Sequence, residues 1–201
     1  MSPPSGHAAL DQLRHGNARF TANLKSARSR PLELPIGQEP LAIVLGCSDA
    51  RVPAEIIFDQ GLGDLFVIRV AGNIVAPSQV ASVEFAAELF GTRLVVVLGH
   101  SECGAITATL AELRGTAPRK ANLASIIDRV RPSVSPLMVT NLRNDPEALL
   151  RAAVRANIVA SAAHLRHGSA IIEELVATEG LLVVGAEYSL ETGVVDFFDG
   201  A

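Results

Sequence analysis

Two short segments of the chain carry the residues best suited to bind a metal ion. His100 and Cys103 follow an apolar run at 94–98, and Cys47 follows another at 41–45. The chain has two cysteines, and both stand in such a position. Imidazole nitrogen and thiolate sulfur are preferred ligands of zinc, and three protein ligands leave its fourth tetrahedral position open, which is the catalytic pattern. If the two segments lie side by side, the sequence predicts a zinc site with one open position.

The elements that must position these residues are strands of one sheet. Both apolar runs are short, contain β-branched residues and end at a glycine, which predicts strands buried on both faces. We expect strands at 41–46, 65–70, 94–99 and 181–186, with an edge strand at 194–198. Helical patterns alternate with them, so the predicted fold is α/β, a central, mainly parallel β-sheet flanked by helices. Ligands of such sheets bind at the carboxyl ends of strands.

Two further elements concern the surroundings of the site. A helix is expected at 106–113, with Ser101 as its N-cap. Glu102 and Glu187 are expected to be exposed or loop residues rather than catalytic acids. Asp49 and Arg51, directly after Cys47, form either an ordinary ion pair or a pair in which the arginine holds the carboxylate away from the open metal position.

The chain divides into an N-terminal arm and a main domain. Residues 8–24 predict an amphipathic helix, and 25–35 form a basic, proline-containing linker. We therefore predict a helical arm and linker at 1–35 and a zinc-binding α/β catalytic domain at 36–201. The arm helix packs either on a partner subunit, as a dimer contact, or on its own domain, and the sequence leaves both open.

Composition excludes several classes of function. The 201 residues are 49% apolar and 19% charged, which suits one globular domain with a substantial core. A net charge of −4 without a basic run argues against nucleic acid as a partner. The sequence contains no stretch of about 18 apolar residues, so it predicts no membrane span. No secretory signal is visible in residues 1–16, and two cysteines fit metal binding better than a disulfide, so we expect a cytoplasmic protein.

At these residues the chain resembles the β-class carbonic anhydrases, and the match extends over nearly the whole sequence. The matching motifs are Gly37-Gln38, Cys47-Ser48-Asp49-Ala50-Arg51, Phe66-Val67-Ile68-Arg69, Val83-Glu84-Phe85 and His100-Ser101-Glu102-Cys103-Gly104. Ala50 stands where the family more commonly has serine. Because several motifs occur in the right order and spacing, the resemblance is far more specific than one short pattern.

The resemblance implies a lyase that reversibly hydrates carbon dioxide to bicarbonate and a proton, by attack of a zinc-bound hydroxide. It implies Zn²⁺ on Cys47, His100 and Cys103, and an Asp49–Arg51 dyad that orients the hydroxide. It also implies a homodimer or a dimer of dimers. Four residues would then bind substrate: Gln38, reaching the partner's active site, Phe66 and Phe85 in an apolar pocket, and Gly104 through its N–H. In a closed state at low pH, Asp49 would become the fourth zinc ligand.

Departures and rival functions remain open at this point. Some bacterial members hold inhibitory bicarbonate with an arginine, a tyrosine and a tryptophan. Arg69 and Tyr188 match the first two, but Val44 stands near the tryptophan position, so we do not expect this regulation. Ala71 replaces a pocket valine of plant members.

Three other functions are compatible with the same residues. They are hydrolysis of carbon disulfide or carbonyl sulfide on the same scaffold, a non-catalytic zinc store, and a dithiol redox protein using both cysteines.

Overall fold

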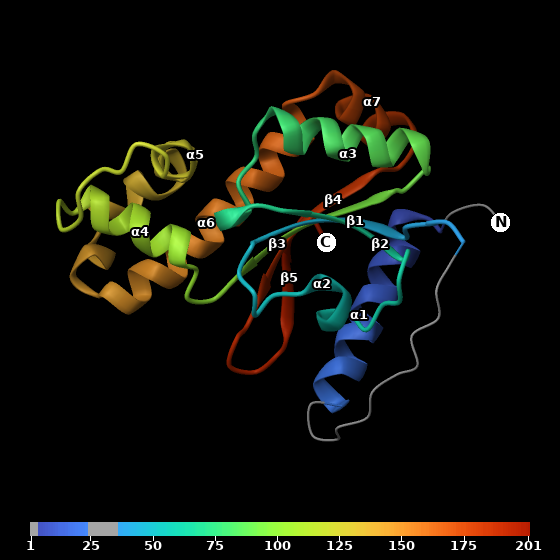
Figure 1. Ribbon diagram of the computed structural model, residues 1–201, viewed down its shortest axis with the longest axis horizontal. Coiled ribbons are helices and arrows are strands. Elements are labelled where there is room, and N and C mark those ends of the chain that lie inside the picture. Colours follow the sequence, from blue (N-terminus) through green and yellow to red (C-terminus); the bar gives the residue numbers. More distant parts are fainter. Residues whose placement is uncertain (1–3, 24–35) are drawn as a thin grey trace.

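A five-stranded sheet forms the centre of the molecule. The computed structural model describes residues 4–23 and 36–201. The strand order is β2-β1-β3-β4-β5, with β1–β4 parallel and β5 antiparallel to β4 (Figure 1). The strands are β1 (Ala42–Gly46), β2 (Leu65–Arg69), β3 (Leu94–His100), β4 (Leu182–Tyr188) and β5 (Val195–Asp199). The predicted mainly parallel α/β sheet with an edge strand is confirmed.

Helices cover both faces of this sheet. They are α1 (Gly6–Asn23), α2 (Ala54–Ile57), α3 (Pro77–Leu89), α4 (Gly104–Leu113), α5 (Ala124–Val134), α6 (Pro146–His167) and α7 (Ala170–Thr178), with 3₁₀ turns η1 (Ala71–Asn73), η2 (Ser135–Val139) and η3 (Asn141–Asn144). One buried apolar cluster joins the sheet to α3–α7, and a second joins it to α1 and α2 (Figure 1). Every residue of β1 and β3 is buried, because both strands have neighbours on each side and a helical layer on each face.

The N-terminal helix packs on the domain of its own chain. Asn17 Nδ2 donates to the carbonyl oxygens of Ile57 (3.1 Å) and Gly193 (3.0 Å), and its Oδ1 accepts from the Val195 N–H. A Cβ on Gly16 would lie 1.8 Å from the Phe58 carbonyl oxygen, so only glycine permits this close approach. The predicted linker, 25–35, lies outside the described residues, and a dimer contact through the arm stays a prediction.

Two local predictions are wrong, for identifiable reasons. Helix α4 begins at Gly104 with Cys103 as N-cap, so Ser101 does not cap it. Ser101 instead ties the loop after β3 to the loop after β4, donating its N–H to the Tyr188 carbonyl and accepting from the Leu190 N–H, each at 3.0 Å. Glu187 lies inside β4 rather than in a loop, and its side chain, 16% exposed, pairs with Arg155.

Candidate metal centre

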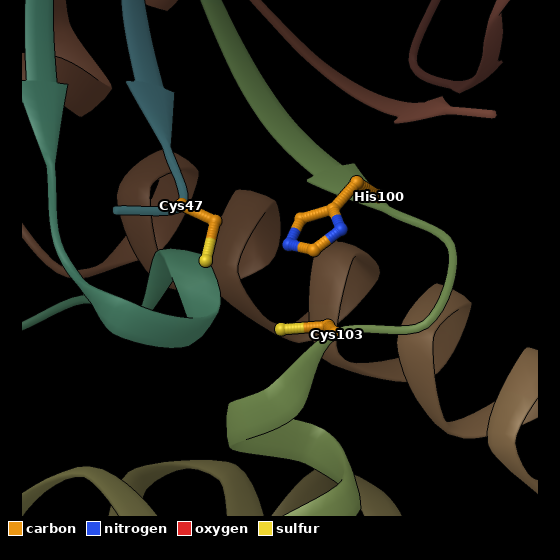
Figure 2. Close-up of side chains that lie close together, drawn as sticks. All are labelled: Cys47, His100 and Cys103. Atoms are coloured by element: carbon orange, nitrogen blue, oxygen red, sulfur yellow. The ribbon is translucent and has the colours of Figure 1, made fainter. Parts of the chain in front are cut away.

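Three predicted ligands converge at the carboxyl ends of β1 and β3. One ligand atom from each of Cys47, His100 and Cys103 lies within 4.8 Å of the other two. All three side chains are buried and point toward one another (Figure 2). The strand ends are level because the parallel register pairs Gly46 with Leu98. The spatial convergence expected from the sequence is therefore confirmed.

The loop after β3 brings Cys103 back toward His100. Glu102 has a φ of +59°, a left-handed conformation that reverses the chain within two residues. Cys103 then takes the N-cap position of α4, where backbone N–H groups lack helical partners. The N–H groups of Ala105 and Ile106 favour the ionised form of the Cys103 sulfur. The helix start would therefore stabilise a Cys103 thiolate once the proton is lost.

His100 presents the correct nitrogen for a metal. Its Nδ1 lies 2.8 Å from the Ser101 carbonyl oxygen, which can only accept, so Nδ1 carries the proton. The lone pair is left on Nε2, which is buried and has no hydrogen-bond partner among the described residues. An unpaired buried nitrogen costs free energy that a bound cation would offset. This orphaned nitrogen between two sulfurs fits a borderline-soft divalent ion such as zinc.

The two thiols have opposite electrostatic environments. The pKa of Cys47 is lowered by the adjacent Cys103 thiol above all, and further by His100 and the backbone N–H groups of Gly72 and Asp49, which together outweigh burial. The same pairing with Cys47, together with burial, raises the pKa of Cys103. Without a metal, one sulfur is therefore ionised and the other keeps its proton.

Metal binding should consequently release protons. Two thiolate ligands require removal of the Cys103 proton, so at pH 7 we expect zinc binding to the metal-free protein to release about one proton per chain or more. Affinity should fall as pH falls, because protons compete for the ligands. Calorimetric titration with zinc in two buffers of different ionisation enthalpy measures the number released. Zinc binding with no proton release would contradict this assignment.

A carboxylate lies beside the three ligands and is held by an arginine. Asp49 Oδ2 is 3.9 Å from His100 Nε2 and accepts from Arg51 Nη2 at 2.8 Å. Asp49 Oδ1 accepts from both the Nε and the backbone N–H of Arg51, each at 3.0 Å. The Arg51 guanidinium holds the pKa of Asp49 well below its usual range, so the carboxylate stays ionised. The pair predicted from the sequence is present and bidentate.

The arginine of β2 has a structural contact that sequence reasoning did not anticipate. Arg69 donates from Nε to the Cys47 carbonyl oxygen at 2.9 Å and from Nη2 to the Asp49 carbonyl oxygen at 2.5 Å. It therefore clamps the backbone that carries one ligand and the carboxylate. No local pattern signals these contacts, because Arg69 is 22 residues from Cys47 in sequence.

The remaining predicted site residues lie at different distances from the centre. Gly104 directly follows Cys103, and a Cβ placed on it would meet no atom within 4 Å, so the space beside its backbone is open. Phe66 pairs in register with Ile43, four residues before Cys47, and packs with Phe85 and Phe90 in an aromatic cluster. Gln38 is exposed and precedes β1. The fold thus brings the ligands, Asp49 and Arg51 together, and leaves Gln38 and the phenylalanines outside this group.

A buried Cys-His-Cys donor set at the carboxyl edge of a parallel sheet, beside an ion-paired carboxylate, is typical of metal-dependent enzymes of the α/β class. The carbonic anhydrase family model matches residues 42–195. Carbonic anhydrase 2 of Mycobacterium tuberculosis is 38% identical over 191 residues, covering 92% of this chain and 89% of the relative. Carbonic anhydrase of Pseudomonas aeruginosa is 35% identical over 195 residues, covering 92% and 86%.

Solved structures agree with this match. The β-carbonic anhydrase CafA of Aspergillus fumigatus superposes with a TM-score of 0.73 at 26% identity, covering 97% of this chain and 91% of that chain. The β-carbonic anhydrase CcaA superposes with a TM-score of 0.71 at 27% identity, covering 96% and 90%. The chain therefore belongs to the carbonic anhydrase family, in its β class, as its motifs predicted. In the described part of the chain, no helix is both long and apolar enough to cross a membrane.

Proposed function

We propose that this protein binds one zinc ion through Cys47, His100 and Cys103 and hydrates carbon dioxide reversibly to bicarbonate and a proton. The observation that carries the proposal is the ionised Asp49 carboxylate, which Arg51 holds beside the three converging side chains. Zinc would supply Lewis acidity that makes a water nucleophilic near neutral pH. Zinc content and the rate of carbon dioxide hydration, measured on the same purified sample, test the proposal.

Asp49 would orient the reacting water. Both carboxylate oxygens already accept hydrogen bonds from Arg51, which fixes the plane of the carboxylate. A remaining lone pair of Oδ2 would accept an O–H of the reacting water and orient the water oxygen toward the carbon of carbon dioxide. The Gly104 N–H, at the open start of α4, would donate to a product oxygen. Arg51 acts through Asp49 and keeps it ionised.

The charges of the three proposed ligands affect how strongly zinc would acidify a bound water. Two thiolates would cancel the formal charge of Zn²⁺, so zinc held by these residues would leave the pKa of its water above the value of about 7 found on a tris-histidine zinc site. Backbone N–H groups that donate to the sulfurs offset part of this loss. We therefore expect activity to rise toward alkaline pH, because the water must lose a proton.

Rival functions make different predictions for the same sample. A dithiol redox protein would use the nearby free thiols of Cys47 and Cys103, and would form a disulfide and hold no metal. A zinc store would hold metal but would not need a bidentate Asp49–Arg51 pair. Hydrolysis of carbon disulfide or carbonyl sulfide needs the same centre, so those substrates belong in the assay panel.

A second copy of the chain is the partner we propose. Within residues 4–23 and 36–201, strand β2 pairs only with β1 and is thus an edge strand, and exposed apolar side chains flank it on α3: Phe85 is 52% and Leu89 62% exposed. An open strand edge beside exposed apolar groups is typical of an interface. In a homodimer or dimer of dimers through this face, Gln38 would enter the partner's active site, and Phe66 and Phe85 would line an apolar pocket for carbon dioxide. The cytoplasmic location stays a prediction.

Arg51→Ala should abolish most activity while zinc stays bound. Without the guanidinium, Asp49 is no longer held off the metal, and the carboxylate can take the fourth position. We expect a loss of about 100-fold or more in kcat/KM, the size typical of a misplaced reacting group. Arg51→Lys is the matched control for charge, because it keeps the cation but not the bidentate fork.

The pH profile separates orientation from charge in these variants. The low pKa of Asp49 means that it does not titrate near neutrality, so the rise in wild-type activity from pH 6 to 9 reports the water. Zinc is quantified for each variant alongside kcat/KM. An Arg51→Ala protein with near wild-type activity, or a wild-type profile flat from pH 6 to 9, would count against the dyad.

A further inference from the structure

One buried side chain of α6 reaches the metal centre through the backbone of η1. Asn157 is 2% exposed, and its Nδ2 donates a 2.8 Å hydrogen bond to the Gly72 carbonyl oxygen. The Gly72 N–H donates in turn to Cys47 Sγ at 3.3 Å. The η1 turn passes beside this sulfur (Figure 2). One residue therefore separates Asn157 from a metal ligand.

Gly72 needs an external restraint to keep its N–H directed at the sulfur. Its φ is +73° and that of Asn73 is +41°, so two successive residues are left-handed. A Cβ on Gly72 would lie 3.0 Å from the Ala105 Cβ, so the turn is close to the first turn of α4. Glycine has the greatest backbone freedom of any residue and no side chain to anchor it. The hydrogen bond from Asn157 supplies that anchor.

The two ligand sulfurs differ in how their N–H donors are fixed. Cys103 is surrounded by donors that belong to the start of a regular helix, the N–H groups of Ala105 and Ile106. The donors to Cys47, from Gly72 and Asp49, belong to irregular segments. The environment of Cys47 therefore depends on long-range contacts, and the Asn157–Gly72 bond spans 85 residues of sequence.

We propose that Asn157 is a positioning residue that tunes the bound zinc through Gly72 and Cys47. An N–H donor withdraws negative charge from a ligand thiolate, which leaves the metal more electron-poor and its water more acidic. Such charge withdrawal has its largest effect on the acidity of the water where two thiolates neutralise the formal charge of the zinc ion. The inference rests on the zinc occupancy proposed above and adds a residue that touches neither metal ligand atoms nor substrate.

The test removes the donor and keeps the volume. Asn157→Asp is nearly isosteric and lacks the amide N–H, and Asn157→Leu removes it without adding a charge. Ser161→Ala is the matched control, because Ser161 lies one turn later on α6, is also buried, and lines the same cavity of about 770 Å³. We expect both Asn157 variants to bind zinc about tenfold more weakly in chelator competition, the lower range for partners of metal ligands.

Two spectroscopic readouts distinguish tuning from a structural effect. In the Co²⁺-substituted protein, the thiolate-to-cobalt charge-transfer bands should shift in both Asn157 variants and stay unchanged in Ser161→Ala. The pH–rate profile of the zinc form should move to higher pH in the same variants. Charge-transfer bands and zinc affinity equal to those of the control, even with a lowered Tm, would overturn the inference.

A measurement on the wild-type protein tests the inference even if the Asn157 variants fail to fold. In the ¹¹³Cd-substituted protein, the Gly72 amide proton should show scalar coupling to the metal through the N–H···Sγ bond, and absence of that coupling would overturn the inference. A wild-type protein that binds no zinc would instead overturn the proposed function. The two failures are therefore distinguishable.

Discussion

His100→Ala protein should purify with almost no zinc and should hydrate carbon dioxide at least about 10³-fold more slowly than wild type. His100 is fully buried and is the one nitrogen ligand that we propose for the zinc, so its removal would leave two thiolates, which seldom hold zinc tightly. Lewis-acid assistance is worth several kcal/mol, and each 1.4 kcal/mol is a factor of ten in rate, which sets the expected size of the loss. Metal analysis and stopped-flow hydration on the same sample measure both effects.

His164→Ala is the matched control for this experiment. His164 lies near the end of α6 and lines the separate cavity between α3, α5 and α6. Its removal should leave zinc content and rate unchanged, so any loss in His100→Ala can be assigned to the ligand. Cys103→Ala should behave like His100→Ala. A folded Cys103→Ala protein with one zinc per chain would remove Cys103 from the ligand set.

The convergence of Cys47, His100 and Cys103 could be predicted from the sequence because each of them stands at or just after the carboxyl end of a buried strand. Gly46 and Gly99 end apolar runs, and the residues after them must emerge at the carboxyl edge of a parallel sheet. The sequence pattern does not show that β1 and β3 are neighbours in the sheet. The structure shows it, because the two strands pair in parallel with Gly46 opposite Leu98. Local hydrophobic pattern and sheet geometry thus account for the core of the site.

The surroundings of the site could not be predicted, because they depend on contacts between distant segments. The hydrogen bond of Asn157 to Gly72 and the contacts of Arg69 with the 47–49 backbone join residues with no local relation. Ser101 has the sequence signature of an N-cap, but its hydroxyl is used by the Leu190 N–H across the sheet edge. Tertiary hydrogen bonds overrode a sound local preference there.

The position of Gln38 bears directly on whether two subunits share each site. Gln38 is exposed and precedes β1, whereas Cys47 follows the carboxyl end of that strand. The five residues of β1 at about 3.3 Å each separate those ends by roughly 17 Å, beyond the reach of a glutamine side chain. If Gln38 takes part in the reaction, we therefore expect it to serve the metal centre of a partner and to donate a hydrogen bond there to a substrate oxygen.

A mixed dimer tests this arrangement, with Asp49→Ala in one subunit and Gln38→Ala in the other. If Gln38 acts on its partner, the second subunit keeps its own Asp49 and receives an intact Gln38 from the first, so one site of two is whole. Activity should then recover toward half of wild type, well above either mutant homodimer. Two different affinity tags allow the heterodimer to be purified free of homodimers, and a wild-type heterodimer carrying the same tags is the control.

If Gln38 instead acts within its own subunit, each site carries one defect and mixing restores nothing. Heterodimers no more active than the average of the two mutant homodimers would therefore rule out the shared site.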